Sequence, residues 1–238
     1  MPADMNKLQQ CLADMKQTYL SDPTAAVRGS SFIYQLHKYC VEELYSALDK
    51  KKVQRIELSD MKKPTGRPHY PTVPIEPDKF QLMQEATLFG SHKNKDEDIV
   101  LTHFANGPQI AIGVRSQMSS VGKNIENYYE GIIGECISLH DRFPMATLGY
   151  VYLLPKNPIK PGLKEEIDLD RAESLFMKIT NRENWHDPND RYEHFAFIKV
   201  DFSTDPPTII PTCQELSIET FFDKLIATHN DRNLFNPL

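Results

Sequence analysis

The stretch from Lys95 to Pro155 places the narrowest limits on the fold, because strand-like, turn-like and helix-like patterns follow one another in it. Asn106-Gly107 is a pair that favours tight hairpin turns. The run 110–117 alternates between two faces, which is typical of a strand. Apolar residues recur at helical spacing over 125–140, and another apolar run covers 149–155. This order predicts strand, turn, strand, helix and strand, an α/β unit with polar residues at its strand ends.

The rest of the chain supplies elements that frame this unit. Asp78 is expected to cap a short helix that runs through Met83 to Thr87. Five prolines over residues 64–77 favour an extended loop. Apolar spacing predicts further helices over 6–20, 32–48, 170–180 and 218–228, and strands over 194–202 and 208–211.

Composition indicates a soluble globular protein. The chain has 238 residues, of which 40% are hydrophobic and 25% charged. There is no apolar run of about 18 residues and no secretory leader, so we expect no membrane span and a cytoplasmic location. A net charge of −6 argues against nucleic-acid binding over the whole surface, but it allows a local basic cleft. The cysteines are too widely spaced for a zinc site or a disulfide framework: Cys11, Cys40, Cys136 and Cys213.

Candidate site residues cluster at the ends of the two paired strands. Asp98 opens the first strand, and the hairpin brings it near Arg115 at the end of the second. An acid beside a cation on adjacent strands can hold a divalent metal and a phosphate together. The bend before the helix can offer a phosphate hydroxyls, amides and a helix N-terminus, through Ser119, Lys123 and Asn124. The helix carries acids that can aim at the strand ends: Glu126, Glu130 and Glu135.

These residues resemble the core of the PD-(D/E)xK nuclease superfamily, with type II restriction endonucleases the most similar members. The resemblance rests on Asp98, the hairpin, Val-Arg-Ser-Gln at 114–117, the acidic helix and Gly-Tyr-Val-Tyr-Leu-Leu-Pro at 149–155. It implies an α/β (α+β) fold with a central mixed sheet flanked by helices. One nuclease-like domain would span 1–238, with its core over about 30–155. Residues 156–238 would add strands and helices for DNA recognition.

The resemblance implies a metal-dependent endonuclease that hydrolyses phosphodiester bonds in double-stranded DNA at specific sites. Its cofactor would be Mg²⁺, with Mn²⁺ as a substitute, and a homodimer would cut both strands. Asp98 matches the first acid of the family motif. The acid-x-Lys part falls on 113–115, where the acid is missing and arginine replaces lysine.

The resemblance also assigns roles to the residues around this gap. Glu130 is the expected stand-in for the second acid, followed by Glu135 and then by Glu42 or Glu43. Metal binding falls to Asp98 and Glu130. Arg115 would stabilise the charge of the transition state, and Gln117 would orient water or phosphate. Lys123 is a further candidate cation.

DNA recognition would involve the polar loop 181–193, while the basic segment 50–68 would contact backbone phosphates. The loop residues predicted to contact DNA are Arg182, Trp185, His186 and Arg191. Structural interpretations remain open beside these roles. Asp98 can be a turn cap or an ion-pair partner of Arg115, and Trp185 can be a packing residue. His103 and His140 are expected at the surface or the edge of the core.

Two other functions are compatible with the sequence. The missing acid at Gly113 favours a catalytically inactive protein with a nuclease fold that binds DNA or another protein. The third hypothesis is a ligand-triggered defence nuclease that cuts without sequence preference.

Overall fold

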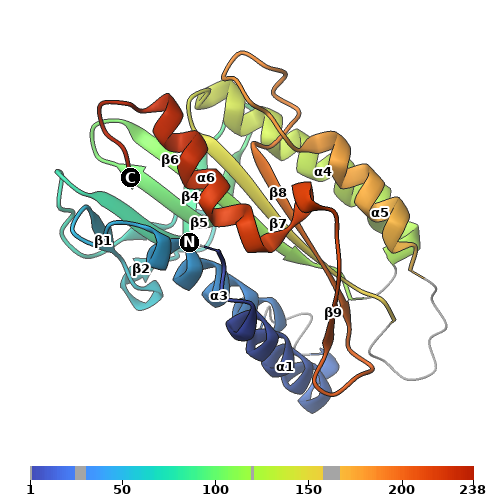
Figure 1. The fold of residues 1–238 in the computed structure, drawn as a ribbon. Coiled ribbons are helices and arrows are strands. Elements are labelled where there is room, and N and C mark those ends of the chain that lie inside the picture. Colours follow the sequence, from blue (N-terminus) through green and yellow to red (C-terminus); the bar gives the residue numbers. More distant parts are fainter. Residues whose placement is uncertain (1, 25–30, 119–120, 158–166) are drawn as a thin grey trace.

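The computed structural model describes residues 2–24, 31–118, 121–157 and 167–238, with the side chains of 121–123 excluded. It is an α/β protein built on a mixed sheet of seven strands in the order β1-β4-β5-β6-β7-β8-β9 (Figure 1). The strands of this sheet are β1 (Val53–Arg55), β4 (Phe80–Phe89), β5 (Asn94–His103), β6 (Gly107–Ser116), β7 (Thr147–Pro155), β8 (His194–Asp201) and β9 (Thr208–Ile210). The helices are α1 (Met5–Ser21), α3 (Ser31–Ala47), α4 (Val121–Arg142), α5 (Leu169–Phe176) and α6 (Ile218–Arg232).

The sheet combines an antiparallel meander with a parallel half. Strands β4, β5 and β6 are antiparallel neighbours. Strands β6, β7 and β8 are parallel, and α4 and α5 lie in the connections between them. Strand β1 adds to one edge in parallel and β9 to the other in antiparallel orientation. A separate two-stranded sheet pairs β2 (Met61–Lys62) with β3 (Tyr70–Pro71).

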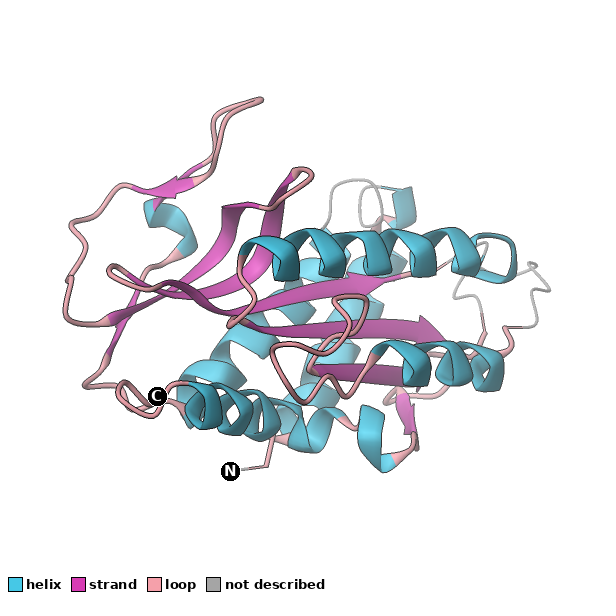
Figure 2. Cartoon of the chain, turned by 90° about the horizontal axis from the view of Figure 1, so that it is seen from above, coloured by secondary structure: helices cyan, strands magenta, loops and turns pink. Residues whose placement is uncertain are grey.

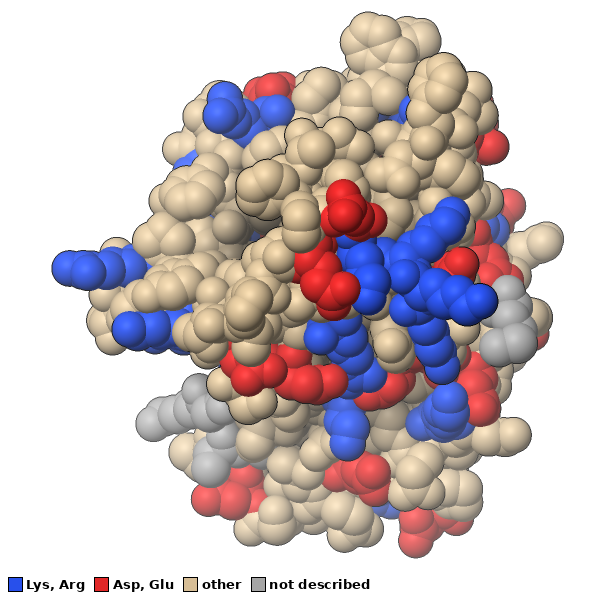
Figure 3. Space-filling model, turned by 90° about the vertical axis from the view of Figure 1, so that its left-hand side faces the viewer, with Lys and Arg blue, Asp and Glu red and all other residues tan. Residues whose placement is uncertain are grey.

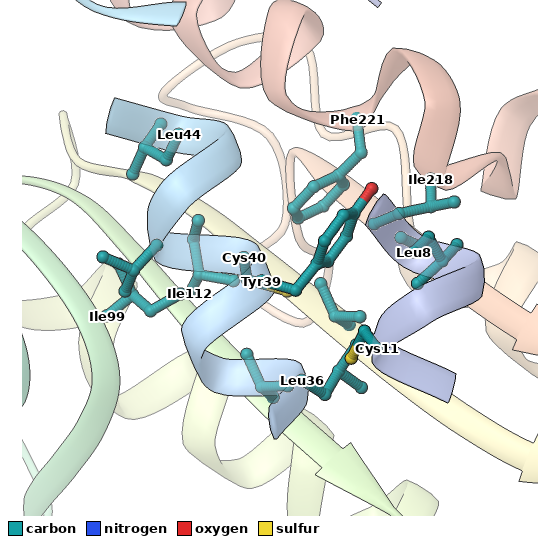
Figure 4. Close-up of a cluster of buried hydrophobic side chains, with 14 of the residues drawn as sticks. Leu8, Cys11, Leu36, Tyr39, Cys40, Leu44, Ile99, Ile112, Ile218 and Phe221 are labelled. Atoms are coloured by element: carbon teal, nitrogen blue, oxygen red, sulfur yellow. The ribbon is translucent and has the colours of Figure 1, made fainter. Parts of the chain in front are cut away.

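Helices α1, α3 and α6 cover one face of the sheet. Leu8 of α1 and Leu36 of α3 are fully buried, and Phe221 of α6 packs with them. Figure 4 shows these side chains converging with Ile99 and Ile112 from the central strands. Because burying a large apolar side chain contributes about 1.5–3 kcal/mol, this cluster provides much of the stabilisation of the fold.

The opposite face is packed against α4 and α5, so helices flank the sheet on both sides (Figure 2). Cys136 and Leu139 of α4 and Phe176 of α5 pack there against Tyr150 and Tyr152 of β7. Every residue of β7 is buried, as expected for a central strand with helices on both faces. Within the described residues, no helix combines the length and the apolar content needed to cross a membrane.

The predicted order of elements over 95–155 is confirmed, and Gly107 has a positive φ of 76° where the hairpin enters β6. The helix predicted from Asp78 to Thr87 is wrong, because these residues enter β4. Seven of the ten residues of this strand are buried, because β1 and β5 pair with it and both cores pack on it. Its apolar residues therefore do not alternate, and the short apolar run does not distinguish a strand from a helix.

Candidate functional site

Strands β5 and β6 part at Asp98, and we call this point the fork. The two strands pair from His103 and Gly107 only as far as Ile99 and Ile112. Beyond it, β5 follows β4 to its end and β6 follows β7 to Ser116. At the fork, Asp98 Oδ2 accepts a hydrogen bond of 2.6 Å from the Val114 backbone N–H. The side chain of Asp98 thus replaces a main-chain partner where the ladder opens.

At the fork, the side chains of β5 also change the face of the sheet toward which they point. Ile99 lies in the core under α1, α3 and α6, whereas Glu97 lies against Glu135 of α4 on the other face. Strand β4 shows the same reversal around Glu85. This residue lies opposite Asp98, because the residues on either side of it pair with Ile99 and Glu97, and its φ is 52°. A left-handed residue inside a strand breaks the simple alternation of faces. This reversal leaves Asp98 directed at β6 instead of at either core.

A pocket of about 390 Å³ opens at the fork. Its wall combines two acids, two cations and a histidine from β5, β6 and α3, with apolar side chains beneath them. We call it the fork pocket, and its lining residues are Phe32, Ile33, His37, Lys95, Asp96, Asp98, Val114, Arg115, Ser116, Met118 and Tyr150. The structure therefore brings Asp98 and Arg115 together, as the hairpin predicted.

His37 enters the pocket from α3. Its Nε2 lies 3.4 Å from the Val114 carbonyl oxygen and 3.6 Å from Asp98 Oδ1. Ligand atoms that share a divalent cation at about 2.1 Å are typically separated by about 3.0–3.5 Å. The two separations measured from His37 Nε2 are thus close to those of atoms that share a small cation. Within the described part of the chain, no three His, Cys, Asp or Glu side chains form a metal-binding group, so the fit depends on the backbone oxygen.

The Asp98 carboxyl is partly removed from water, and this shifts its protonation. Burial raises the pKa of the Asp98 carboxyl above its usual range, against the opposing effects of His37, the Val114 N–H and Lys95. The neighbouring positive charge thus does not offset the loss of hydration. A cation placed on this carboxylate would stabilise its charged form.

Two further acids meet below the pocket. Lys95 Nζ lies 2.6 Å from Glu135 Oε2, and the Glu135 side chain is only 7% exposed. Glu97 is hydrogen-bonded to Glu135, and its Oε1 has no partner. Burial, followed by the charge of Glu135, raises the pKa of Glu97 well above its usual range. Burial thus favours the protonated form of Glu97, and Lys95 is ion-paired with Glu135.

Arg115 and Gln117 occupy different environments. The Arg115 guanidinium lies over the ring of Tyr128, 5.2 Å from its centroid, and lines the fork pocket. Gln117 is buried, and its Oε1 accepts a hydrogen bond of 2.9 Å from the Tyr152 hydroxyl. It is not among the residues that line the pocket. The structure thus supports a ligand contact for Arg115 and gives Gln117 a packing role.

Gly113 lies where the family motif has its second acid, and no side chain fits there. A Cβ at this position would lie 2.5 Å from Tyr150 Cε2 and 2.8 Å from Cδ2. Gly113 is paired with Tyr150 across β6 and β7. The ring of Tyr150 therefore occupies the space that an acidic side chain would need.

The acids of α4 separate into exposed and buried ones. Glu130 is exposed and does not line the fork pocket, and Glu126 is exposed in an ion pair with Arg171. Glu135 is the acid of α4 that approaches β5. The expectation that Glu130 supplies the second metal ligand gains no support from this position. Asn124 is half-buried at the start of α4, whereas Ser119 and the Lys123 side chain lie outside the described part of the chain.

The loop 181–193 is anchored by a buried ion pair. Arg182 is 1% exposed, and its guanidinium donates to Glu193 Oε1 at 2.7 Å. It therefore offers no surface to DNA, and its predicted DNA contact is wrong. His140 was expected at the surface or at the edge of the core but is fully buried, with Nε2 3.2 Å from both Glu193 oxygens. Trp185 is 55% exposed, and His186 and Arg191 are exposed too, so these three remain candidate DNA contacts.

The basic segment 50–68 does not form an unbroken positive surface. Lys50, Lys51 and Lys52 are exposed, but Arg55 is engaged by Glu42 at 2.7 Å and by Glu57 at 2.8 Å. Figure 3 shows a face on which basic side chains gather with acidic ones directly beside them. Any contact of this surface with DNA phosphates would be local.

Sequence reasoning missed His37 and Lys95. His37 sits beside the apolar stripe of its helix, and its partners in the fork come from residues 98 and 114. Lys95 stands near the start of a strand, and its partner Glu135 comes from a helix 40 positions later in the chain. Neither residue belongs to a short motif, and their contacts depend on the reversal at the fork, which is a feature of the folded sheet.

Comparisons of this chain with protein-family models, with curated proteins and with solved structures find no match.

Proposed function

We propose that this chain is a metal-dependent endonuclease that hydrolyses phosphodiester bonds in duplex DNA, with the fork pocket as its active site. The observation that carries the proposal is the meeting of Asp98, His37 and the Val114 carbonyl beside Lys95 and Arg115. One side of the pocket suits a divalent cation and the other suits a phosphate.

The topology supports the same proposal. The short strands β1, β2 and β3 and a 3-10 turn lie between α3 and β4. Apart from them, the chain from α3 to β7 runs in the order helix, three strands, helix and strand. The three strands form an antiparallel meander, and the last strand is parallel to the third. This is the order expected for a restriction-endonuclease-like core, and it places Asp98 on the central hairpin.

Four residues of the pocket have chemical roles in this proposal. Asp98 and His37, with the Val114 carbonyl, would hold Mg²⁺ or Mn²⁺. When bound, the ion would polarise the phosphate and lower the pKa of a water molecule. Arg115 would hold phosphate oxygens and stabilise the charge that develops on them. An arginine stays protonated, so Arg115 cannot accept the proton of the attacking water.

The first test is digestion of plasmid and phage DNA with Mg²⁺ or Mn²⁺. Asp98→Asn keeps the size of the side chain and an oxygen for the Val114 N–H, but it removes the negative charge. We expect it to lower the cleavage rate about 100-fold or more. His37→Ala should cause a comparable loss. If both variants cleave like the parent protein, the fork pocket is not the active site.

Glu130→Gln is the matched control for these variants. It removes an exposed acid of the neighbouring helix without changing the fork pocket. We expect it to retain the parent's rate. A loss as large as that of Asp98→Asn would instead return Glu130 to the metal site. Discrete fragments on a gel would indicate site-specific cutting, and a smear would indicate a nuclease without sequence preference.

A catalytically inactive nuclease-fold protein is the second candidate. Two observations favour it: Tyr150 fills the space beside Gly113, and the cation site has only two side-chain ligands among the described residues. In that case the chain would bind DNA or another protein without cleaving DNA. Intact DNA after digestion with either ion would support this function over the first.

A further inference from the structure

We propose that Lys95 contacts a backbone phosphate of the nucleic acid in the fork pocket and that Glu135 positions it there. This proposal rests on the proposed DNA-binding function. It adds a phosphate-contacting residue from β5 and a positioning residue from α4. Neither role follows from the acid-x-Lys pattern, which falls on β6.

The contacts around Lys95 fix its ammonium at the pocket wall. The bond from Lys95 Nζ to Glu135 Oε2 is 2.6 Å long, within the range of a charge-assisted hydrogen bond. Glu135 is buried on α4 and also meets Glu97 from the same strand as Lys95. A flexible lysine side chain is thereby held in one direction, which reduces the entropy lost when it binds a ligand.

The ammonium keeps donors for a ligand. A protonated lysine has three N–H donors and no acceptor. Within the described residues, Glu135 is the one group to which Lys95 donates. The Lys95 side chain is 26% exposed, and it lines the same pocket as Arg115. Two cations on separate strands can therefore approach one phosphate, or adjacent phosphates, from two sides.

A purely structural role is the competing explanation, because the pair also ties β5 to α4. A structural role predicts a loss of stability without a change in the electrostatics of DNA binding. If Lys95 contacts a phosphate, a variant without the Lys95 charge should release fewer counterions on binding DNA than the parent protein does. These two outcomes can be separated by measuring stability and salt dependence on the same variants.

The experiment measures binding of a fluorescent DNA duplex by anisotropy in EDTA over a range of salt concentrations. Lys95→Met keeps most of the side-chain volume and removes the charge. We expect the slope of log K against log salt to fall in magnitude by about one. Lys95→Arg should retain the parent's slope. Lys93→Met is the matched control, because Lys93 is an exposed neighbour outside the fork pocket, and it should change the slope less.

Glu135→Gln tests the positioning role. It retains the Lys95 charge, so the salt slope should stay, while the cleavage rate with Mg²⁺ should fall. Unchanged slopes for Lys95→Met, in a variant that is folded by circular dichroism, would overturn the phosphate contact while leaving the nuclease proposal intact. A parent protein that binds no duplex in EDTA and also leaves DNA intact with Mg²⁺ or Mn²⁺ would overturn both, and that result is recognised without any variant.

Discussion

At the residue scale, Gly113 is the position where the structure makes the sharpest prediction about a single substitution. Because its added Cβ would press on the buried ring of Tyr150, Gly113→Ala overpacks the core between β6 and α4. We expect it to lower the free energy of unfolding by about 1–3 kcal/mol. Urea denaturation followed by circular dichroism measures this change.

Gly131→Ala provides the control for Gly113. Gly131 lies exposed on α4, and a Cβ there meets nothing within 4 Å. The same substitution should therefore stabilise the protein by about 0.4–1 kcal/mol through the unfolded chain. If Gly113→Ala stabilised the protein as well, the close approach of Tyr150 would be refuted. The same contact argues against placing a glutamate at this position by Gly113→Glu.

The sequence was informative about Asp98 and Arg115 because a hairpin brings its strand ends together by local rules. It could not identify His37 or Lys95, since their roles depend on how α3 and α4 pack on the two faces of the sheet. The sequence also did not show which charged residues are buried. Arginine is a residue type that often contacts DNA, yet the guanidinium of Arg182 pairs with Glu193 inside the protein.

At the scale of elements, Glu193 joins segments that are distant in sequence. It accepts hydrogen bonds from Arg182, from Arg232 of α6 and from the Leu148 N–H of β7. Glu193→Gln keeps the shape but leaves two arginines without their carboxylate. Breaking a buried ion pair in this way typically costs about 3–5 kcal/mol. We expect a loss of unfolding free energy of that order in urea denaturation.

The exposed pair of Glu126 with Arg171 is the comparison for this ion pair. Its two side chains are 67% and 54% exposed, so water and salt screen the interaction. Glu126→Gln should change the free energy of unfolding by less than about 1 kcal/mol. Equal effects of the two substitutions would show that the Glu193 network does not hold the loop, β7 and α6 together.

Helices and strands were predicted correctly where a local sequence pattern determines them. The prediction failed for β4, where burial in the sheet removes the alternating pattern of a strand. The helices and the hairpin follow from apolar spacing and the Asn-Gly turn. Strand β4 was missed because it is covered on both faces and reverses its facing around Glu85. The order of strands in the sheet, including the parallel half, depends on long-range pairing that no short window contains.

At the scale of the whole molecule, buried histidines link stability to pH. Burial, with the charges of Arg182 and Arg232, lowers the pKa of His140 to about 3. In the unfolded chain the pKa is about 6.5, so between these values the unfolded state binds more protons. The contribution of His140 to stability is therefore complete above pH 6.5 and is lost as the pH falls toward 3.

His140→Asn isolates this effect from the other titrating groups, including Glu97, whose raised pKa acts in the opposite direction. We expect the difference in unfolding free energy between parent and variant to shrink by about 1.4 kcal/mol for each pH unit below 6.5. Urea denaturation at pH 7, 6 and 5 measures it. A difference that is constant across this range would contradict a neutral, buried His140.

The layer beneath α1, α3 and α6 draws its side chains from almost the whole length of the chain, from Ala3 to Leu225. During synthesis, the apolar face of α3 is made long before α6, which packs against it. Until α6 has been made, that face is exposed to other chains and to chaperones. His37 lies on α3, so the helix that carries it into the fork pocket packs fully only after the C-terminal helix has been made.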